Sequence, residues 1–297
     1  MHCRRATLRR HERQCRVKRL NFKMMELNKI YNENCLDTMA RMPDGFVDLV
    51  VTSPPYDGLR DYNGYSFDFE SVAKELFRVV KVGGVVVWVV GDATKNGSET
   101  GTSFRQALYF MECGFNLHDT MIYMKDNPPP VGGPRRYYQS FEFCFVLSKG
   151  SPRAFNPIVE ERRNKWNDKR VVRTRPVTRN KAGVFTEKQI KNTGLVRLQN
   201  VWSYVVSGGS VAEEMFAHEH PAIFPEALCR DHIFSWSNEG DLVYDPFGGS
   251  GTTAKMAHLQ NRKWIISEIS SEYCELSRKR IEPYLLQGSL FTSYNGV

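Results

Sequence analysis

The sequence has no long apolar run, no closely paired cysteines and no internal repeat. Its longest uninterrupted apolar stretch, Val85 to Val90, is far too short to cross a bilayer. The seven cysteines are scattered without a C-x-x-C pair, which argues against a disulfide framework or a zinc site and favours a reducing compartment. The basic N-terminus is followed by no apolar stretch, so we expect no secretory leader.

The composition is that of a folded protein. The 297 residues suit one large α/β domain with an insertion, or two modest domains. Hydrophobic residues make up 41% of the chain and charged residues 25%, which is enough for a sizeable core and excludes wholesale disorder.

Positive charge is concentrated in two blocks. The chain carries a formal net charge of +8, and residues 1–24 hold nine Lys or Arg against the single acid Glu12. The rest of the chain is therefore neutral in total. Within it, residues 151–200 hold 13 Lys or Arg against four acids, so the remaining body is acidic.

The two blocks allow different interpretations. Residues 1–24 show no periodic apolar face, which predicts a disordered basic tail, a start misplaced upstream of Met24 and Met25, or an arm that binds a polyanion. The second block combines basic residues with Phe155, Trp166 and Phe185. That mixture suits a phosphate backbone and exposed bases, although an ordinary charged surface insertion would look similar.

Strand and helix patterns alternate along the rest of the chain. This alternation predicts a mostly parallel, doubly wound α/β sheet with helices on both faces. Expected strands cover 27–31, 46–51, 85–90, 119–125, 141–147, 242–244 and 264–267. Expected helices cover 35–41, 71–80, 103–113 and 225–237, and two more begin near 252 and 272. Gly83-Gly84 is expected to end the second helix, and Ser271 to cap the last.

A glycine-rich turn, Asp245-Pro246-Phe247-Gly248-Gly249-Ser250-Gly251-Thr252-Thr253, lies between a predicted strand and a predicted helix. Glycines at 249 and 251 would let the backbone approach a ligand, and the helix N-terminus offers free N–H groups. Glu268 ends the next strand, where an acid can accept hydrogen bonds from ribose hydroxyls. A nicotinamide site would require GxGxxG, which is absent, so the pattern indicates another nucleoside cofactor.

A second motif, Thr52-Ser53-Pro54-Pro55-Tyr56, ends a buried strand. Two prolines stop the strand because neither can donate a backbone hydrogen bond. They also fix the Pro54 carbonyl beside the Ser53 hydroxyl and the Tyr56 ring. Both oxygens can accept hydrogens of an exocyclic amine, and the ring can stack on a planar base, although a merely structural turn is the simpler alternative.

These two motifs together resemble the amino-group DNA methyltransferases that act on cytosine N4 or adenine N6. The proline motif precedes the glycine motif, which is similar to the β motif order of that family. Further stretches of similarity are Leu76–Gly84, Val86–Asp92, Phe141–Gly150 and His220–Pro225 with Leu228. The resemblance covers roughly residues 26–283, with the basic block standing in place of a target recognition domain.

The resemblance implies a domain division and a set of site residues. It implies a catalytic domain at 25–150 and 201–284, a recognition lobe at 151–200 and a C-terminal tail at 285–297. The implied catalytic residues are Ser53, Pro54, Pro55 and Tyr56. The implied cofactor residues are Asn34, Asp245, Phe247, Gly249, Gly251, Thr252 and Glu268. Asn34 departs from the family, which often has an acid there. The DNA-binding candidates are Arg162, Arg163, Lys169, Arg170, Arg173, Arg175 and Arg179.

The resemblance also implies the chemistry. S-adenosylmethionine would be the cofactor, no metal would be needed, and double-stranded DNA would be the partner. A target base would flip out of the duplex, and its amine would attack the methyl group directly. No cysteine lies near Ser53 in the sequence, which disfavours the ring-carbon methylation that needs a cysteine nucleophile. By resemblance, serine at position 53 favours cytosine N4, and adenine N6 is the alternative.

Several expectations stay open at this level. A catalytically idle DNA-binding module is the alternative from a different functional class. A companion restriction endonuclease is a possible partner, the chain is compatible with a monomer or a homodimer, and a prokaryotic or phage-encoded cytoplasmic protein is expected. We expect His218 and His220 to form a surface turn without metal, Asp126–Pro130 to form a stiff loop near the site, and Trp202 and Trp236 to be core residues.

Overall fold

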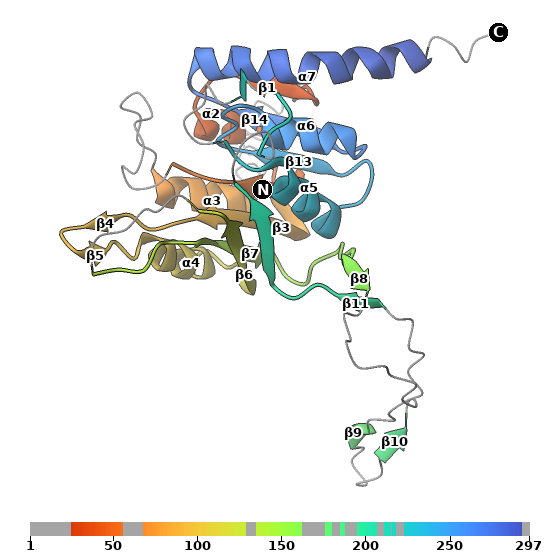
Figure 1. The fold of residues 1–297 in the computed structure, drawn as a ribbon. Coiled ribbons are helices and arrows are strands. Elements are labelled where there is room, and N and C mark those ends of the chain that lie inside the picture. Colours follow the sequence, from red (N-terminus) through yellow and green to blue (C-terminus); the bar gives the residue numbers. More distant parts are fainter. Residues whose placement is uncertain are drawn as a thin grey trace, which may run out of the picture.

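A computed structural model describes most of the body of the chain (Figure 1). The described residues are 25–55, 68–128, 135–161, 176–179, 185–187, 195–206, 211–214, 216–217 and 223–292. Residues 1–24, Tyr56, and the basic candidates from Arg162 to Arg175 lie outside them, as do His218 and His220. Arg179 is described by its backbone alone.

Eight strands of the described residues form one mixed sheet. Their order is β1 (Lys29–Tyr31), β14 (Lys263–Ser267), β13 (Leu242–Asp245), β2 (Val47–Thr52), β3 (Val80–Val90), β7 (Phe141–Ser148), β6 (Asn116–Asp126) and β12 (Val201–Val205). Seven of the eight run parallel, and β7 is antiparallel to both of its neighbours. The predicted mostly parallel sheet is therefore confirmed.

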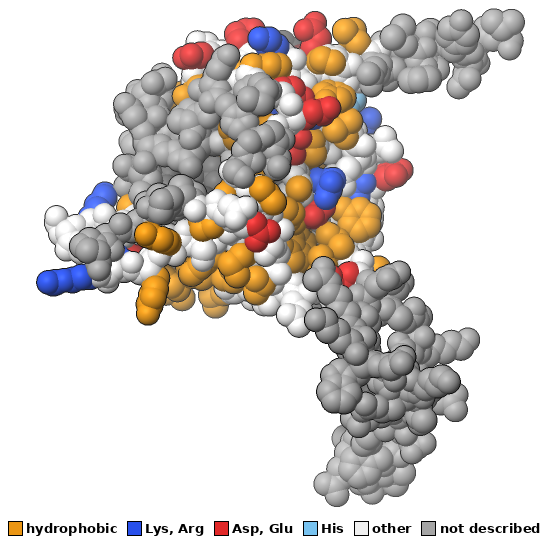
Figure 2. All heavy atoms as spheres, in the orientation of Figure 1, with side chains coloured by type: hydrophobic (Ala, Val, Ile, Leu, Met, Phe, Trp, Pro, Cys, Tyr) orange, Lys and Arg blue, Asp and Glu red, His pale blue; other side chains and the backbone are white. Residues whose placement is uncertain are grey.

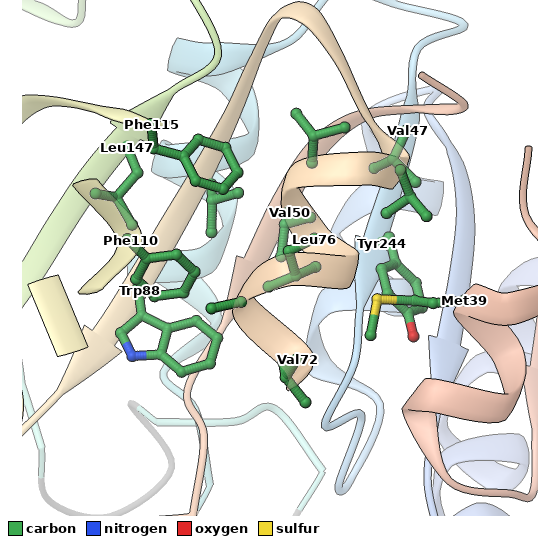
Figure 3. Close-up of a cluster of buried hydrophobic side chains, with 14 of the residues drawn as sticks. Met39, Val47, Val50, Val72, Leu76, Trp88, Phe110, Phe115, Leu147 and Tyr244 are labelled. Carbon is green, nitrogen blue, oxygen red and sulfur yellow. The ribbon is translucent and has the colours of Figure 1, made fainter. Parts of the chain in front are cut away.

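Helices cover both faces of this sheet, as the alternation predicts. One face packs against α2 (Cys35–Arg41), α3 (Phe69–Val79) and α4 (Thr102–Glu112). Figure 3 shows part of that core, where Trp88, Phe110 and Leu76 converge. The other face packs against α5 (Glu226–Trp236), α6 (Thr252–Leu259) and α7 (Ser271–Thr292), and it buries Trp202 and Trp236 as expected. From Leu49 to Val51, successive residues of β2 alternate between the two cores because a strand has period two.

Two expected element boundaries are wrong. Gly83-Gly84 does not end a helix, because α3 ends at Val79 and both glycines lie within β3, at an irregularity in its pairing with β2. A Cβ at Gly84 would lie 2.9 Å from the Asp48 carbonyl oxygen, so close backbone approach requires the glycine. Ser271 is the first residue of α7, and the cap is Ser270, whose Oγ accepts a hydrogen bond from the Tyr273 amide at 3.4 Å.

The remaining strands form small antiparallel pairs. A hairpin of β4 (Thr94–Lys95) and β5 (Ser98–Glu99) follows β3. Within residues 151–200, β8 (Val159–Glu161) pairs with β11 (Leu195–Arg197), and β9 (Pro176–Arg179) pairs with β10 (Phe185–Glu187). The start of this segment packs on the body, because the Asn156 side chain donates to the carbonyls of Phe234 and Ser237 at the end of α5.

At its C-terminal end, α7 continues to Thr292, past residue 284 where the sequence analysis ends the catalytic domain. No helix in the described part of the chain is long and apolar enough to span a membrane.

Candidate active site

The strand order places the two sequence motifs side by side. Strands β13 and β2 are parallel neighbours, with Val243 opposite Leu49 and Tyr244 opposite Val50. Ser53 directly follows β2, and the glycine-rich turn directly follows β13, so both lie at the carboxyl edge of the sheet. Connections leave in opposite directions from these two strands, and such a switch point is where open α/β sheets bind ligands.

A cavity of about 390 Å³ lies at this switch point. Its volume falls within the range of roughly 300–1,000 Å³ that is usual for small-molecule sites. Residues of both motifs line this cavity, together with residues at the carboxyl end of β14 and at the starts of α2 and α3. The lining residues are Glu33, Asn34, Cys35, Leu36, Ser53, Pro55, Asp68, Val72, Phe224, Asp245, Pro246, Phe247, Gly248, Gly249, Ser250, Thr252, Thr253, Ser267, Glu268, Ile269, Ser270 and Tyr273.

Asp245 joins the two motifs through hydrogen bonds. Its Oδ1 accepts from the Thr52 hydroxyl at 2.6 Å and from the Phe247 amide at 2.9 Å, and its Oδ2 accepts from the Thr253 hydroxyl at 2.7 Å. Thr253 Oγ1 lies 3.2 Å from the Val51 carbonyl oxygen, so the start of α6 is also tied to β2. This buried carboxyl therefore fixes the residue before Ser53 relative to the glycine turn.

Glu268 lines the cavity from the end of β14. Its Oε2 accepts from the Gly249 amide and its Oε1 from the Ser270 amide, both at 2.8 Å. Burial raises the pKa of the Glu268 carboxyl, and the nearby Asp245 carboxyl adds to the increase. Burial likewise raises the pKa of Asp245. Each Glu268 oxygen keeps a second lone pair, so the carboxylate can still accept hydrogens from a ligand.

Asn34 lines the cavity, but its side chain has a local partner. Its Oδ1 accepts from the Leu36 amide at 2.9 Å and thereby caps α2. The neighbouring Glu33 also lines the cavity and binds Arg41 and Thr38 through its carboxylate. Sequence reasoning selected Asn34 alone, because the pairing of Glu33 with α2 becomes visible only in the folded chain.

Gly251, which the sequence analysis assigned to the cofactor, does not line the cavity. It has φ +80° at the start of α6, and a Cβ there would lie 2.9 Å from both Cβ and Oγ of Ser277 on α7. Gly249 does line the cavity, and its carbonyl accepts from the Ser277 hydroxyl at 2.7 Å. Gly251 therefore serves helix packing, and Gly249 faces the ligand space.

Gly251→Ala is expected to destabilise the protein more than Gly240→Ala. Both glycines have φ near +80°, but no atom lies within 4 Å of a Cβ at Gly240. Left-handed strain alone costs roughly 1–2 kcal/mol, and overpacking against Ser277 adds roughly 1–3 kcal/mol at Gly251. Urea unfolding of both variants measures the difference, and equal losses would contradict the proposed contact with α7.

A cysteine also lines the cavity, although no cysteine lies near Ser53 along the sequence. Cys35, at the start of α2, lines the cavity together with Ser53. Burial raises the pKa of its thiol to about 12, so it is protonated near neutral pH and is a poor nucleophile. The five cysteines of the described residues are all free, and no group of three His, Cys, Asp or Glu side chains in that part of the chain is arranged to hold a metal.

A buried ion cluster supports the glycine turn from behind. The side chains of Lys255 on α6 and Arg280 on α7 are 0% exposed. Lys255 Nζ lies 2.6 Å from Glu214 and 2.9 Å from Glu226, and Arg280 Nη2 lies 2.6 Å from Glu226. Arg280 Nη1 also donates to the Ser250 carbonyl at 2.8 Å. The turn is thereby held against α5 and α7, a support that the sequence analysis did not predict.

Comparisons with known proteins show the family of the chain. A family model described as DNA methylase, for N6 and N4 enzymes, matches residues 47–279. The orphan methyltransferase M.BamHII of Bacillus amyloliquefaciens is 54% identical over 248 residues, which cover 82% of this chain and 91% of that protein. The type II methyltransferase M.Cfr9I of Citrobacter freundii is 26% identical and covers 87% of this chain and 89% of its own.

Solved structures share the fold. The PvuII DNA methyltransferase, described as cytosine-N4-specific, superposes with a TM-score of 0.61 at 22% identity and covers 86% of each chain. A DNA modification methylase from Thermus thermophilus, solved with S-adenosyl-L-methionine, gives a TM-score of 0.58 at 22% identity and covers 86% of this chain and 93% of its own.

Proposed function

The chain belongs to the N6/N4 family of DNA methylases, and from that premise we propose that it methylates the N4 amine of a cytosine extruded from duplex DNA. It is a DNA amino-methyltransferase that uses S-adenosylmethionine. The observation that carries the proposed methyl transfer is that Ser53 and the glycine turn line the same cavity, and the choice of cytosine rests on the serine at position 53. Nothing favours the alternative of an idle DNA-binding module.

The residues around the cavity suit the cofactor. The Glu268 carboxylate is available to accept hydrogens from the ribose hydroxyls, while Phe247 and Leu36 offer apolar contacts to adenine. Asn34 can accept from the adenine amine through the second lone pair of Oδ1. When bound, the cofactor supplies an electrophilic methyl group on a sulfonium centre.

The serine–proline corner would activate the target amine. The amine lone pair of a nucleobase is delocalised into the ring and is a weak nucleophile. The Ser53 hydroxyl and the Pro54 carbonyl can accept hydrogen bonds from the two N–H groups of the amine. These bonds favour a pyramidal nitrogen with an available lone pair. Fixed acceptors of this kind act by positioning and electrostatics, without a covalent intermediate.

Cofactor affinity is expected to fall as the pH is lowered, and the fall should begin at a higher pH than it would with a glutamate of ordinary pKa. The carboxylate form of Glu268 accepts the ribose hydrogens, and burial raises its pKa, so protonation begins earlier as the pH falls. Calorimetric titration with S-adenosylmethionine across acidic pH measures the effect. Glu268→Gln should bind S-adenosylmethionine more weakly, and its affinity should depend less on pH. Some dependence should remain because the Asp245 carboxyl is still present. A pH dependence equal to that of the wild type would assign the effect to another group.

The DNA partner is proposed from the family and from charge. The basic candidates in residues 151–200, from Arg162 to Arg179, would contact phosphates, and some would read base edges in the major groove. Tyr56 would stack on the extruded base. A companion endonuclease, a monomeric or homodimeric state and a cytoplasmic location in a prokaryotic or phage setting remain predictions.

Cytosine is proposed as the target because serine occupies position 53, which resembles the N4-specific members of the family. The test is to incubate unmodified DNA with the protein and S-adenosylmethionine and to digest it to nucleosides. N4-methylcytosine is the expected product in the mass spectrum. N6-methyladenine alone would overturn the choice of base and leave the amino-methyltransferase activity intact.

A further inference from the structure

A short segment ahead of β7 exposes two arginines and two tyrosines. Arg135, Arg136, Tyr137 and Tyr138, here called the rim segment, are all exposed, and the two tyrosine residues are 101% and 62% exposed. Burial of an aromatic ring is strongly favourable, so two adjacent exposed rings are unusual on a protein surface. Exposed rings next to cations are the combination that binds phosphates and stacks on bases.

The strand register places the rim segment at the same edge of the sheet as the cavity. Strand β7 is antiparallel to β3 and pairs Phe143 with Val90, so β7 begins where β3 ends. Only β3 lies between β7 and β2 in the sheet. Since neighbouring strands are about 4.8 Å apart, β7, which follows the rim segment, lies about 10 Å from β2, which precedes Ser53. The Lys125 amide donates to the Ser140 carbonyl at 2.7 Å and extends the ladder beyond Phe141. The rim segment therefore lies at the edge of the sheet at which β2 ends and Ser53 follows.

One arginine fixes the rim segment to the neighbouring hairpin. Arg136 donates to the Gly97 carbonyl and lies 3.6 Å from the Glu99 carboxylate, both in the turn and strand of β4–β5. Figure 2 shows Lys and Arg side chains beside hydrophobic ones at the end of the molecule where Figure 1 places this hairpin. With Arg136 engaged in this way, the two tyrosine rings and Arg135 remain directed at solvent.

We propose that the rim segment contacts duplex DNA beside the extruded base. Extrusion removes the stacking partner of the neighbouring bases, and an aromatic ring can cover the exposed base face. Arg135 belongs to the same exposed segment and would bind a backbone phosphate. This inference rests on the proposed duplex substrate, and it adds a second DNA surface to residues 151–200, formed by the catalytic domain itself.

The experiment compares variants of the rim with variants of matched exposed residues elsewhere. The test variants are Arg135→Ala and the double change Tyr137→Ala with Tyr138→Ala. The controls are Arg278→Ala on α7 and Phe234→Ala near the end of α5, both exposed and away from the cavity. The probe is a short fluorescein-labelled duplex that carries the methylation sequence found by sequencing modified bases, and binding is followed by anisotropy.

The double tyrosine variant is expected to bind the duplex about 10-fold more weakly than the wild type. Arg135→Ala should reduce the slope of log Kd against log salt by about 0.9, which is the value for one lost phosphate contact. Both control variants should match the wild type, and changing Tyr137 and Tyr138 to phenylalanine should restore binding because the rings remain.

Two contrary outcomes are distinguishable. A wild type that binds and methylates the duplex, with rim variants that behave like Phe234→Ala, overturns the rim contact and leaves the proposed function standing. A wild type that neither binds nor methylates duplex DNA removes the duplex substrate and the rim contact together. Loss of affinity in the phenylalanine variant as well would assign the effect to the tyrosine hydroxyls and would overturn stacking.

Discussion

Ser53→Ala is expected to lower the rate of methyl transfer by about 10²- to 10³-fold and to leave cofactor affinity nearly unchanged. Removal of one preorganised polar partner of a transition state costs about this much in other enzymes. Ser53 lines the cavity together with the glycine turn and Glu268, to which we assign the cofactor. Single-turnover transfer of a labelled methyl group to DNA measures the rate.

Calorimetry of S-adenosylmethionine binding to the same variant provides the internal control. A variant that loses affinity and rate together would indicate damage to the cavity as a whole. A variant that transfers methyl groups at the wild-type rate would show that the serine–proline corner is not the site of amine activation.

Arg280→Met is expected to lower the free energy of unfolding by about 3 kcal/mol. Removing one member of a buried ion cluster typically costs roughly 3–5 kcal/mol because a charge is left without its partner. The lower end applies because Lys255 stays beside Glu214 and Glu226, whose side chains are 15% and 17% exposed. The Ser250 carbonyl also loses its donor, so the glycine turn should become less ordered.

The matched control for this prediction lies two residues earlier on the same helix. The Arg278 side chain is 48% exposed and forms a surface ion pair with Glu275, so Arg278→Met should change stability by less than about 0.5 kcal/mol. Denaturant unfolding of both variants makes the comparison. Equal losses would mean that the buried cluster contributes no more to stability than a surface ion pair does.

Local sequence patterns predicted most of the elements, because each buried strand and amphipathic helix has its own hydrophobic period. The strand at 46–51 and the helix at 35–41 agree closely with β2 and α2. Gly83-Gly84 misled the prediction, since the same dipeptide that ends helices also permits close approach between strands. Ser270 and Ser271 could not be distinguished as caps from their order alone.

The candidate site was predicted in part. One cavity is lined by most of the residues that the sequence grouped together: Asn34, Ser53, Pro55, Asp245, Phe247, Gly249, Thr252 and Glu268. Pro54 is buried between Ser53 and Pro55, and Gly251 packs on α7. The roles of these residues stay predictions, as do those of Tyr56 and the basic candidates, which lie outside the described side chains. At the start of α2 the family resemblance selected Asn34 alone, and Glu33, Cys35 and Asp68 were missed because no local pattern shows that the starts of α2 and α3 face this cavity.

The sequence by itself determined the alternating elements, the parallel sheet, the two motifs and the type of chemistry that they suit, because these depend on residue type and short-range spacing. Only the tertiary structure decided that Asp245 ties Thr52 to the glycine turn, that Lys255 and Arg280 support the turn, and that the segment with the exposed tyrosines precedes β7 at the same edge of the sheet as Ser53. Those contacts join residues far apart in the chain. Their partners are selected by sheet order and register, which no local pattern specifies.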